Sequence, residues 1–309
     1  MDFTADGQTD MIAATFEGTV FLVAGGKEGW SQPEHITDSQ GRNVVISLYY
    51  DMEEHEYNNA DRSPEGSEDP GGHCVSAFLW DWDNDGDMDL LLGAKDGELY
   101  RQMNEGKPGA PSFTGINHPI NAGGSPFKMK GGLTAARMVD WNGDGLDDMV
   151  CGGFEGGVNL YLNTGKLNQP QFSAAQVLIP KDKTGATPNK GLYVDVTDYD
   201  GDGDLDLIVG GYKYTKAPKV KLTKAQKDEL KALQAKKDEL DERQSDLIDK
   251  AMEASADLSD EERKSAVQAA LRSDEITAFR TAGTKLTEQI HTIKPPSKRD
   301  SGIWLYRRN

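Results

Sequence analysis

Carboxylates crowd into the nine-residue stretch DWDNDGDMD, which begins at Asp81. Aspartates at close range repel one another, so a compact loop built from them is unfavourable unless a cation lies among them. Calcium suits this spacing, because it takes roughly six to eight oxygen ligands and a loop can offer one at every second position. We therefore predict a calcium loop in which the side chains of Asp81, Asp83, Asp85 and Asp89 and the backbone carbonyl of Asp87 bind the ion.

The residues around this loop distinguish two kinds of calcium-binding protein. A helical calcium-binding hand has a glycine at position 6, a glutamate at position 12 and a helix on each side. Gly86 supplies the glycine, which tolerates the positive φ of a sharp turn, but position 12 is Leu92. Short apolar runs at 75–80 and 90–92, the second ending at Gly93, predict instead two β-strands joined by the loop.

The same pattern recurs downstream, in DWNGDGLDD from Asp140 and DYDGDGDLD from Asp198. The three starts are 59 and 58 residues apart, a regularity that indicates an array of similar supersecondary units. A weaker copy, DFTADGQTD, begins at Asp2; Thr4 replaces a carboxylate there, so we expect a weaker or empty site. In the loop from Asp140 the predicted ligands are the side chains of Asp140, Asn142, Asp144 and Asp148 and the carbonyl of Leu146. In the loop from Asp198 they are the side chains of Asp198, Asp200, Asp202 and Asp206 and the carbonyl of Asp204. The candidates in the weaker copy are Asp2, Thr4, Asp6, Gln8 and Asp10.

Each unit continues in the same way after its loop and second strand. Short aromatic and β-branched segments, each entered through glycine, predict a third strand after Gly97, Gly156 and Gly302. The tripeptides at Pro111 and Pro170 are predicted to open a fourth strand. Four strands per unit predict blades of a β-propeller, whose sheets bury both faces against their neighbours. The first unit lacks the strand before its loop and the last stops after its third strand, so the expected counts are three, four, four and three.

The three intact acidic loops, at 81–89, 140–148 and 198–206, and the strands around them resemble the FG-GAP or VCBS-type repeats of integrin-like β-propellers, especially those of secreted bacterial proteins. The resemblance covers nearly the whole chain outside two insertions. It implies a calcium ion on the loop between the first and second strands of each blade, hence three sites and a weaker fourth candidate. The expected fold is mainly β, with four recognisable blades of which the first and last are incomplete. It implies no activity, because propellers carry many unrelated functions.

A helical insertion is expected in the last blade, over 216–298. The segment 222–254 contains no glycine or proline and places Leu233, Leu240 and Leu247 seven residues apart, which is typical of a long amphipathic helix with a narrow, coiled-coil-like apolar seam. The expected domains are therefore the propeller over 1–215, the helical insertion over 216–298 and a returning strand of the last blade over 299–309.

Two capping boxes divide this insertion into a hairpin. Thr223 with Gln226 is expected to start the first helix, and Ser259 with Glu262 to start a second helix that ends at Pro295. The facing stripe of the second helix comprises Val267, Leu271, Phe279, Leu286 and Ile290. Two interpretations stay open: a self-paired hairpin with solvated charges, and a docking arm for another protein.

The second insertion lies within the first repeat interval, at about 47–74. A solvated loop is favoured over a metal site at 53–56, because adjacent side chains point in different directions. Tyr49, Tyr50 and Tyr57 could line a ligand surface on this loop.

Composition constrains the partners and the compartment. The 309-residue chain carries a net charge of −18, so nucleic acid is not an expected partner, because phosphate binding needs clustered Lys and Arg. No stretch approaches the length of a membrane span. Cys74 and Cys151 are expected to be buried thiols rather than a disulfide. Calcium loops of this kind work at extracellular ion concentrations, which favours a secreted or cell-surface protein.

The motifs distinguish between an enzyme, a sugar-binding module and a scaffold. An enzyme is not expected, because the five histidines lack metal-ligand spacing and no nucleophile elbow or phosphate-binding glycine loop occurs. The alternatives are a carbohydrate-binding module or a non-catalytic domain of a larger secreted enzyme. An aromatic residue recurs at position 2 of the acidic loops, as Trp82, Trp141 and Tyr199, and this repetition favours a packing role over stacking on sugars. The favoured function is a calcium-stabilised extracellular adhesion or scaffolding module. Its protein partner would bind the helical hairpin or the propeller face, with a glycan as the alternative ligand.

Overall fold

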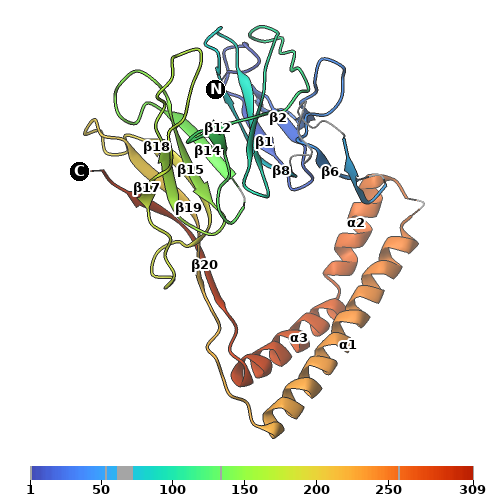
Figure 1. The fold of residues 1–309 in the computed structure, drawn as a ribbon. Helices are drawn as coiled ribbons and strands as arrows, with labels where there is room; N and C mark the ends of the chain where they lie inside the picture. The colour runs from blue at the N-terminus through green and yellow to red at the C-terminus, as the bar shows by residue number, and fades with distance from the viewer. Residues whose placement is uncertain (1, 53, 61–71, 133, 257, 309) are drawn as a thin grey trace. The chain divides into compact units, whose positions relative to one another are not determined.

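The computed structural model describes residues 2–52, 54–60, 72–132, 134–256 and 258–308 (Figure 1). Part of the predicted 47–74 insertion therefore lies outside the described residues. The chain separates into two compact units, one formed by Met1–Tyr214 with Arg299–Asn309 and the other by Thr215–Lys298. The first unit is built of small β-sheets and the second of helices.

Four sheets make up most of the first unit, and their strand counts are three, four, four and three. In spatial order they are β1 (Met11–Ala14), β2 (Val20–Val23) and β5 (Glu34–His35); β11 (His118–Pro119), β10 (Leu99–Gln102), β9 (Asp89–Ala94) and β8 (Cys74–Trp80); β14 (Thr134–Val139), β15 (Asp148–Gly153), β16 (Val158–Tyr161) and β17 (Gln176–Ile179); and β18 (Lys190–Thr197), β19 (Asp206–Thr215) and β20 (Lys298–Tyr306). The described strands form several small sheets and no closed barrel.

In the second and third sheets, alternating side chains of the second strand bury both of its faces. Leu90 and Leu92 pack in a cluster with residues of the first sheet, whereas Leu91 packs in a cluster with residues of the third. Val150 in turn packs toward the fourth sheet, in the cluster that contains Val194. Because successive side chains of a strand point to opposite faces, an uninterrupted apolar run is what a strand between two packed sheets requires.

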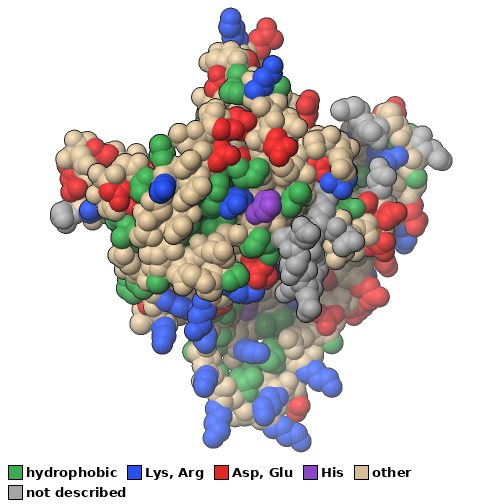
Figure 2. Space-filling model, turned by 45° about the horizontal axis from the view of Figure 1, so that its top comes forward, with side chains coloured by type: hydrophobic (Ala, Val, Ile, Leu, Met, Phe, Trp, Pro, Cys, Tyr) green, Lys and Arg blue, Asp and Glu red, His purple; other side chains and the backbone are tan. Residues whose placement is uncertain are grey.

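The sheets pack in chain order, and the last one leaves its outer face exposed. β1 contacts β8, β8 contacts β14, and β14 and β15 contact β18. On the fourth sheet Tyr193 is 49% exposed and Ile303 is 77% exposed. The space-filling view shows apolar side chains interspersed with acidic and basic ones on the visible face of the molecule (Figure 2).

The fourth strands begin later than predicted. PSF and PQF were expected to open them, but Phe113 and Phe172 instead form single bridges to Asn104 and Asn163, just past the ends of the third strands β10 and β16. Both rings are buried between sheets. The prediction was wrong because a phenylalanine after a proline marked a core position here rather than the start of a strand.

Smaller features complete the first unit. Three two-stranded hairpins are formed by β3 (Gly25–Gly26) with β4 (Gly29–Trp30), β6 (Leu48–Asp51) with β7 (Glu56–Asn59), and β12 (Asn121–Ala122) with β13 (Ser125–Pro126). In the second hairpin the rings of Tyr50 and Tyr57 meet edge to face, 5.1 Å apart. Cys74 and Cys151 are free and buried, and burial raises the pKa of Cys74 to about 12.

The second unit contains three helices, where two were predicted: α1 (Lys224–Ala254), α2 (Asp260–Leu271) and α3 (Asp274–Ile293). α1 packs against both α2 and α3. The capping boxes at Thr223 with Gln226 and at Ser259 with Glu262 are present.

The predicted second helix is interrupted because a further cap lies inside it. The Ser273 side chain accepts a hydrogen bond from the N–H of Ile276, and Asp274 and Glu275 occupy the first turn that follows. A serine cap followed by acidic residues stabilises a helix N-terminus, so α2 ends and α3 begins at this point. No helix formed by the described residues is both long and apolar enough to cross a bilayer.

Candidate metal centres

All four acidic loops fold with the same backbone hydrogen bonds. The first carboxylate of the second loop, Asp81, accepts hydrogen bonds at 3.1 Å from the N–H groups of Asp85 and Gly86, and Asp85 accepts one at 3.0 Å from the N–H of Asp87. The same three bonds, between 2.8 and 3.1 Å, recur in the loops that begin at Asp2, Asp140 and Asp198. The position-6 glycines have positive φ throughout, at Gly7 (86°), Gly86 (96°), Gly145 (86°) and Gly203 (93°).

The ninth position of each loop is a buried carboxylate that ties the loop to the sheet. Asp89 is 1% exposed; its Oδ2 accepts a hydrogen bond from the N–H of Trp82 at 2.8 Å, and its Oδ1 accepts one from the N–H of Asn104 at 2.7 Å. Asp10, Asp148 and Asp206 accept equivalent bonds, their Oδ1 atoms from the N–H groups of Gly25, Asn163 and Arg308. This position therefore has a structural role that the spacing of the aspartates did not reveal.

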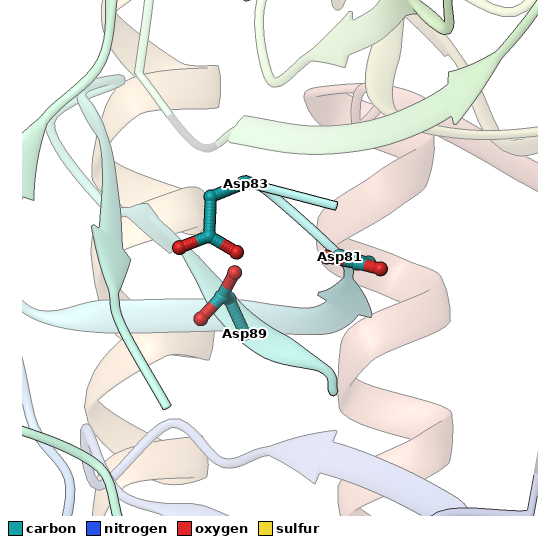
Figure 3. Close-up of side chains that lie close together, drawn as sticks. All are labelled: Asp81, Asp83 and Asp89. Carbon is teal, nitrogen blue, oxygen red and sulfur yellow. The ribbon is translucent and has the colours of Figure 1, made fainter. Parts of the chain in front are cut away.

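Two loops bring three carboxylates close enough to share one ion. One carboxylate oxygen from each of Asp81, Asp83 and Asp89 lies within 4.8 Å of the others, and Figure 3 shows the carboxylates of Asp83 and Asp89 facing one another. Asp198, Asp200 and Asp206 form the same arrangement. Carboxylate oxygens are the ligands that calcium prefers, so both clusters fit a hard divalent cation.

The remaining predicted ligands are arranged differently. The third loop has an amide in its cluster, and Asn142 Nδ2 donates a hydrogen bond to Asp144 Oδ2 at 2.9 Å. In the first loop Thr4 and Gln8 replace two of the acids, and Asp10 accepts hydrogen bonds from three backbone N–H groups. Asp85 and Asp202 lie outside the two close clusters and accept N–H bonds within their own loops.

Asp87, for which only the backbone carbonyl was predicted to matter, has a buried side chain. It is 6% exposed, and its Oδ1 accepts no hydrogen bond from the described residues. Burial, reinforced by Asp85, Asp83 and Asp81, raises the pKa of Asp87 to about 6. Burial also raises the pKa of Asp89 to about 6, against the lowering effect of its two N–H donors. Without a cation, this loop therefore holds ionised carboxylates at a free-energy cost.

Two arginine side chains after β20 contact acidic loops, Arg307 the fourth and Arg308 the third. Arg307 Nη1 lies 3.3 Å from Asp200 Oδ2, and Arg308 Nη1 donates to the carbonyl oxygen of Trp141 at 2.9 Å. Arg307 thus supplies part of the positive charge that this cluster requires.

Two asparagines were missed by sequence reasoning. The Asn104 side chain accepts hydrogen bonds from the N–H groups of Gly106 and Ser112, at 3.0 and 2.7 Å, and donates to the carbonyl of Met88. Asn163 does the same in the next unit. Their shared position, 15 residues after the ninth-position aspartate, was the available signal.

The residues at position 2 of the loops show why the aromatic positions recur. Trp82 is 7% exposed and packs between the second and third sheets, and Trp141 packs against the next cluster. Tyr199 is 59% exposed, because no described sheet follows the fourth.

The fold and the loops define a class: a repeat protein of small, successively packed sheets, in which the first two strands of a unit are joined by an acidic loop of fixed geometry. Residues 140–209 match the FG-GAP-like repeat, from the first residue of one acidic loop to just past the end of the next. This part of the chain therefore contains an FG-GAP-like repeat. Comparisons with curated proteins and with solved structures gave no match. Repeats of this family are often extracellular protein-interaction modules.

Proposed function

We propose that the chain is a calcium-stabilised, non-catalytic β-propeller module that works outside the cell in adhesion or scaffolding. The four sheets are its blades, and calcium occupies the loops that begin at Asp81, Asp140 and Asp198, with the loop at Asp2 weakest. The helical unit is a docking arm for a protein partner.

One observation carries this proposal: two loops with the same backbone cage each gather three carboxylates within 4.8 Å of one another. Such a cluster is unfavourable alone, as the raised pKa of Asp89 illustrates, and a divalent ion removes the repulsion. Because the ninth-position carboxylate also holds the third strand, ion binding is coupled to the stability of the sheet.

Two further features support an interaction role. FG-GAP-like repeats are typically extracellular, where calcium is present at about millimolar concentration. The helix α1 buries none of its described side chains fully, so its long surface is available to a partner.

Calcium titration by calorimetry, with the bound metal counted by mass spectrometry, tests this function. We expect Asp83→Ala and Asp200→Ala each to remove one bound ion and to reduce the rise in melting temperature that calcium causes. Asp6→Ala is the matched control from the weakest loop and should change neither. Chelation with EDTA should lower the melting temperature of the wild type. A wild type that binds no calcium and melts identically in EDTA would refute the metal sites.

A further inference from the structure

Arg101 departs from the pattern of the chain's own repeats. In each unit a backbone N–H group just after the third strand binds Oδ1 of the ninth-position aspartate; the donors are Gly25, Asn104, Asn163 and Arg308. Aligning the units on these donors places Leu22, Arg101, Leu160 and Leu305 at the same position, three residues before the donor. Arg101 also pairs with Leu91 across the sheet, as Leu160 pairs with Val150 and Leu22 with Ile12. An arginine therefore occupies a position at which the other three units have leucine.

This position faces the core between two sheets. Leu160 is 3% exposed in the cluster between the third and fourth sheets, and Leu22 packs against the cluster between the first and second. Arg101 correspondingly lies on the side of the second sheet that faces the third. A charge placed where a leucine would pack is unfavourable unless it is paired, so its environment matters.

The guanidinium group of Arg101 stacks on an aromatic ring but forms no hydrogen bond with the part of the chain that the structure describes. Its central carbon lies 4.2 Å from the centre of the Trp82 ring. Its Nε atom is buried and donates to no described residue. Asp89 and Asp83 attract it through space, yet neither forms an ion pair with it. Stacking holds the planar group in place and leaves its N–H groups available.

Two adjoining cavities open beside this group, with volumes of about 410 and 490 Å³. Arg101, Trp82, Pro170 and Gln171 line both cavities. Asp83 lines the first of them as well, and Pro119 and Asn121 line the second. Volumes of about 300–1,000 Å³ are typical of small-molecule sites.

The lining indicates the chemistry of the ligand. A planar guanidinium with free N–H groups matches a carboxylate, with which it can form two parallel hydrogen bonds. The side-chain amides of Asn121 and Gln171, which form no hydrogen bond with described residues, can both donate to and accept from hydroxyl groups. Pro119 lies on the edge strand β11 and has no N–H to donate, so this edge is poorly suited to adding a peptide strand.

We propose that Arg101, Asn121 and Gln171 form a binding site for a small hydroxylated carboxylic acid, of which a sugar acid is the simplest class. Arg101 binds the carboxylate and the amides bind the hydroxyl groups. The site does not depend on the adhesion function proposed above. Of the residues assigned as calcium ligands, Asp83 alone lines one of the two cavities.

The test is binding of D-glucuronate by the full chain, measured by calorimetry and by ¹⁵N NMR of the arginine Nε–H resonances, with calcium at about 1 mM throughout. D-Glucose is the control ligand, because it has the same ring without the carboxylate. Arg101→Leu is the main variant; it installs the residue that the other three units have, so it should fold. Arg101→Lys keeps the charge and removes the planar fork.

We expect the wild type to bind glucuronate at about millimolar concentration or below, with a shift of one Nε–H resonance that is absent from Arg101→Leu. Glucose should bind about tenfold more weakly or not at all, and both Arg101 variants should lose about tenfold or more in affinity for glucuronate. Gln171→Ala, on an exposed side chain, should weaken binding and gives a second route if Arg101→Leu does not fold.

Three results would overturn the proposal. They are no glucuronate binding by the wild type, equal affinity for glucose and glucuronate, and undiminished binding by Arg101→Leu, which would place the ligand on bound calcium instead. None of them bears on the calcium stoichiometry, so failure here and failure of the metal sites are distinguishable.

Discussion

Replacing Asp10 with alanine should destabilise the first unit whether or not calcium is present. Asp10 Oδ2 accepts hydrogen bonds from the N–H groups of Phe3 and Thr4, both at 2.8 Å, and Oδ1 accepts one from Gly25 at 2.9 Å. These donors hold the pKa of Asp10 below its usual range in spite of the opposing effect of burial. The charged carboxylate is thus stabilised mainly by backbone N–H groups, in the loop with the weakest set of metal ligands.

The expected loss follows from the three donors. A buried or half-buried N–H group that loses its acceptor costs about 1–2 kcal/mol here, which gives a decrease of about 3–6 kcal/mol in the free energy of unfolding. Asp6→Ala removes one acceptor, for the N–H of Gln8, in an exposed part of the same loop and should cost less than about 1 kcal/mol. Because the folded-state pKa of Asp10 is lowered, its stabilisation is present at neutral pH and is lost as the pH falls below about 4.

Urea unfolding followed by tryptophan fluorescence measures this loss, because all five tryptophans belong to the first unit. The unfolding curves of wild type, Asp10→Ala and Asp6→Ala should be compared at pH 7.5, once with calcium and once with EDTA. If Asp10→Ala matched the wild type in EDTA and lost stability only with calcium, Asp10 would be a metal ligand and the reasoning from its N–H donors would be wrong.

Three further outcomes are expected. In EDTA the wild type should gain stability relative to Asp87→Asn between pH 7.5 and pH 5, because the raised pKa of about 6 makes ionised Asp87 unfavourable above that pH; parallel pH profiles would contradict the burial argument. Replacing 216–298 by a short Gly-Ser linker should leave the tryptophan fluorescence and melting temperature of the first unit nearly unchanged, since Ala217 N and Ser297 Oγ are 3.1 Å apart and the ends are readily joined. Ser273→Ala should cost the helical unit about 1 kcal/mol, seen as a lower midpoint of the circular dichroism signal at 222 nm, because the cap of α3 is lost; an unchanged midpoint would mean that packing alone sets the helix boundary.

The acidic loops were predictable because their determinants are local. Alternating oxygens and a glycine at position 6 specify the turn wherever they occur, and the apolar run after each loop specifies a strand buried on both faces. The break before α3 has a local signal in the sequence, Ser273 followed by Asp274 and Glu275, but the apolar stripe continues past it and predicts one uninterrupted helix.

Features that depend on contacts between sheets could not be predicted in the same way. The ninth-position aspartates resemble the other ligands in sequence, yet only the fold shows that Asp89 and Asp206 bind the ends of third strands, 15 and 102 residues away. Likewise, Arg101 is an ordinary strand residue until the N–H donors align the four units and show leucine at its equivalents.

The common backbone cage implies that ligand chemistry, and not loop shape, ranks the four loops for calcium. The loop at 81–89 has five carboxylates, one of them on Asp87 with a buried and unpartnered oxygen, so it gains most from a divalent ion. The loop at 198–206 has as many, but Arg307 already neutralises part of its charge and must be displaced or accommodated. Asn142 and Leu146 replace charged residues in the third loop, and Thr4 and Gln8 replace them in the first, where the backbone also satisfies Asp10. Since calcium affinity follows the number and charge of the ligands, the loops should fill in the order 81–89, 198–206, 140–148 and 2–10.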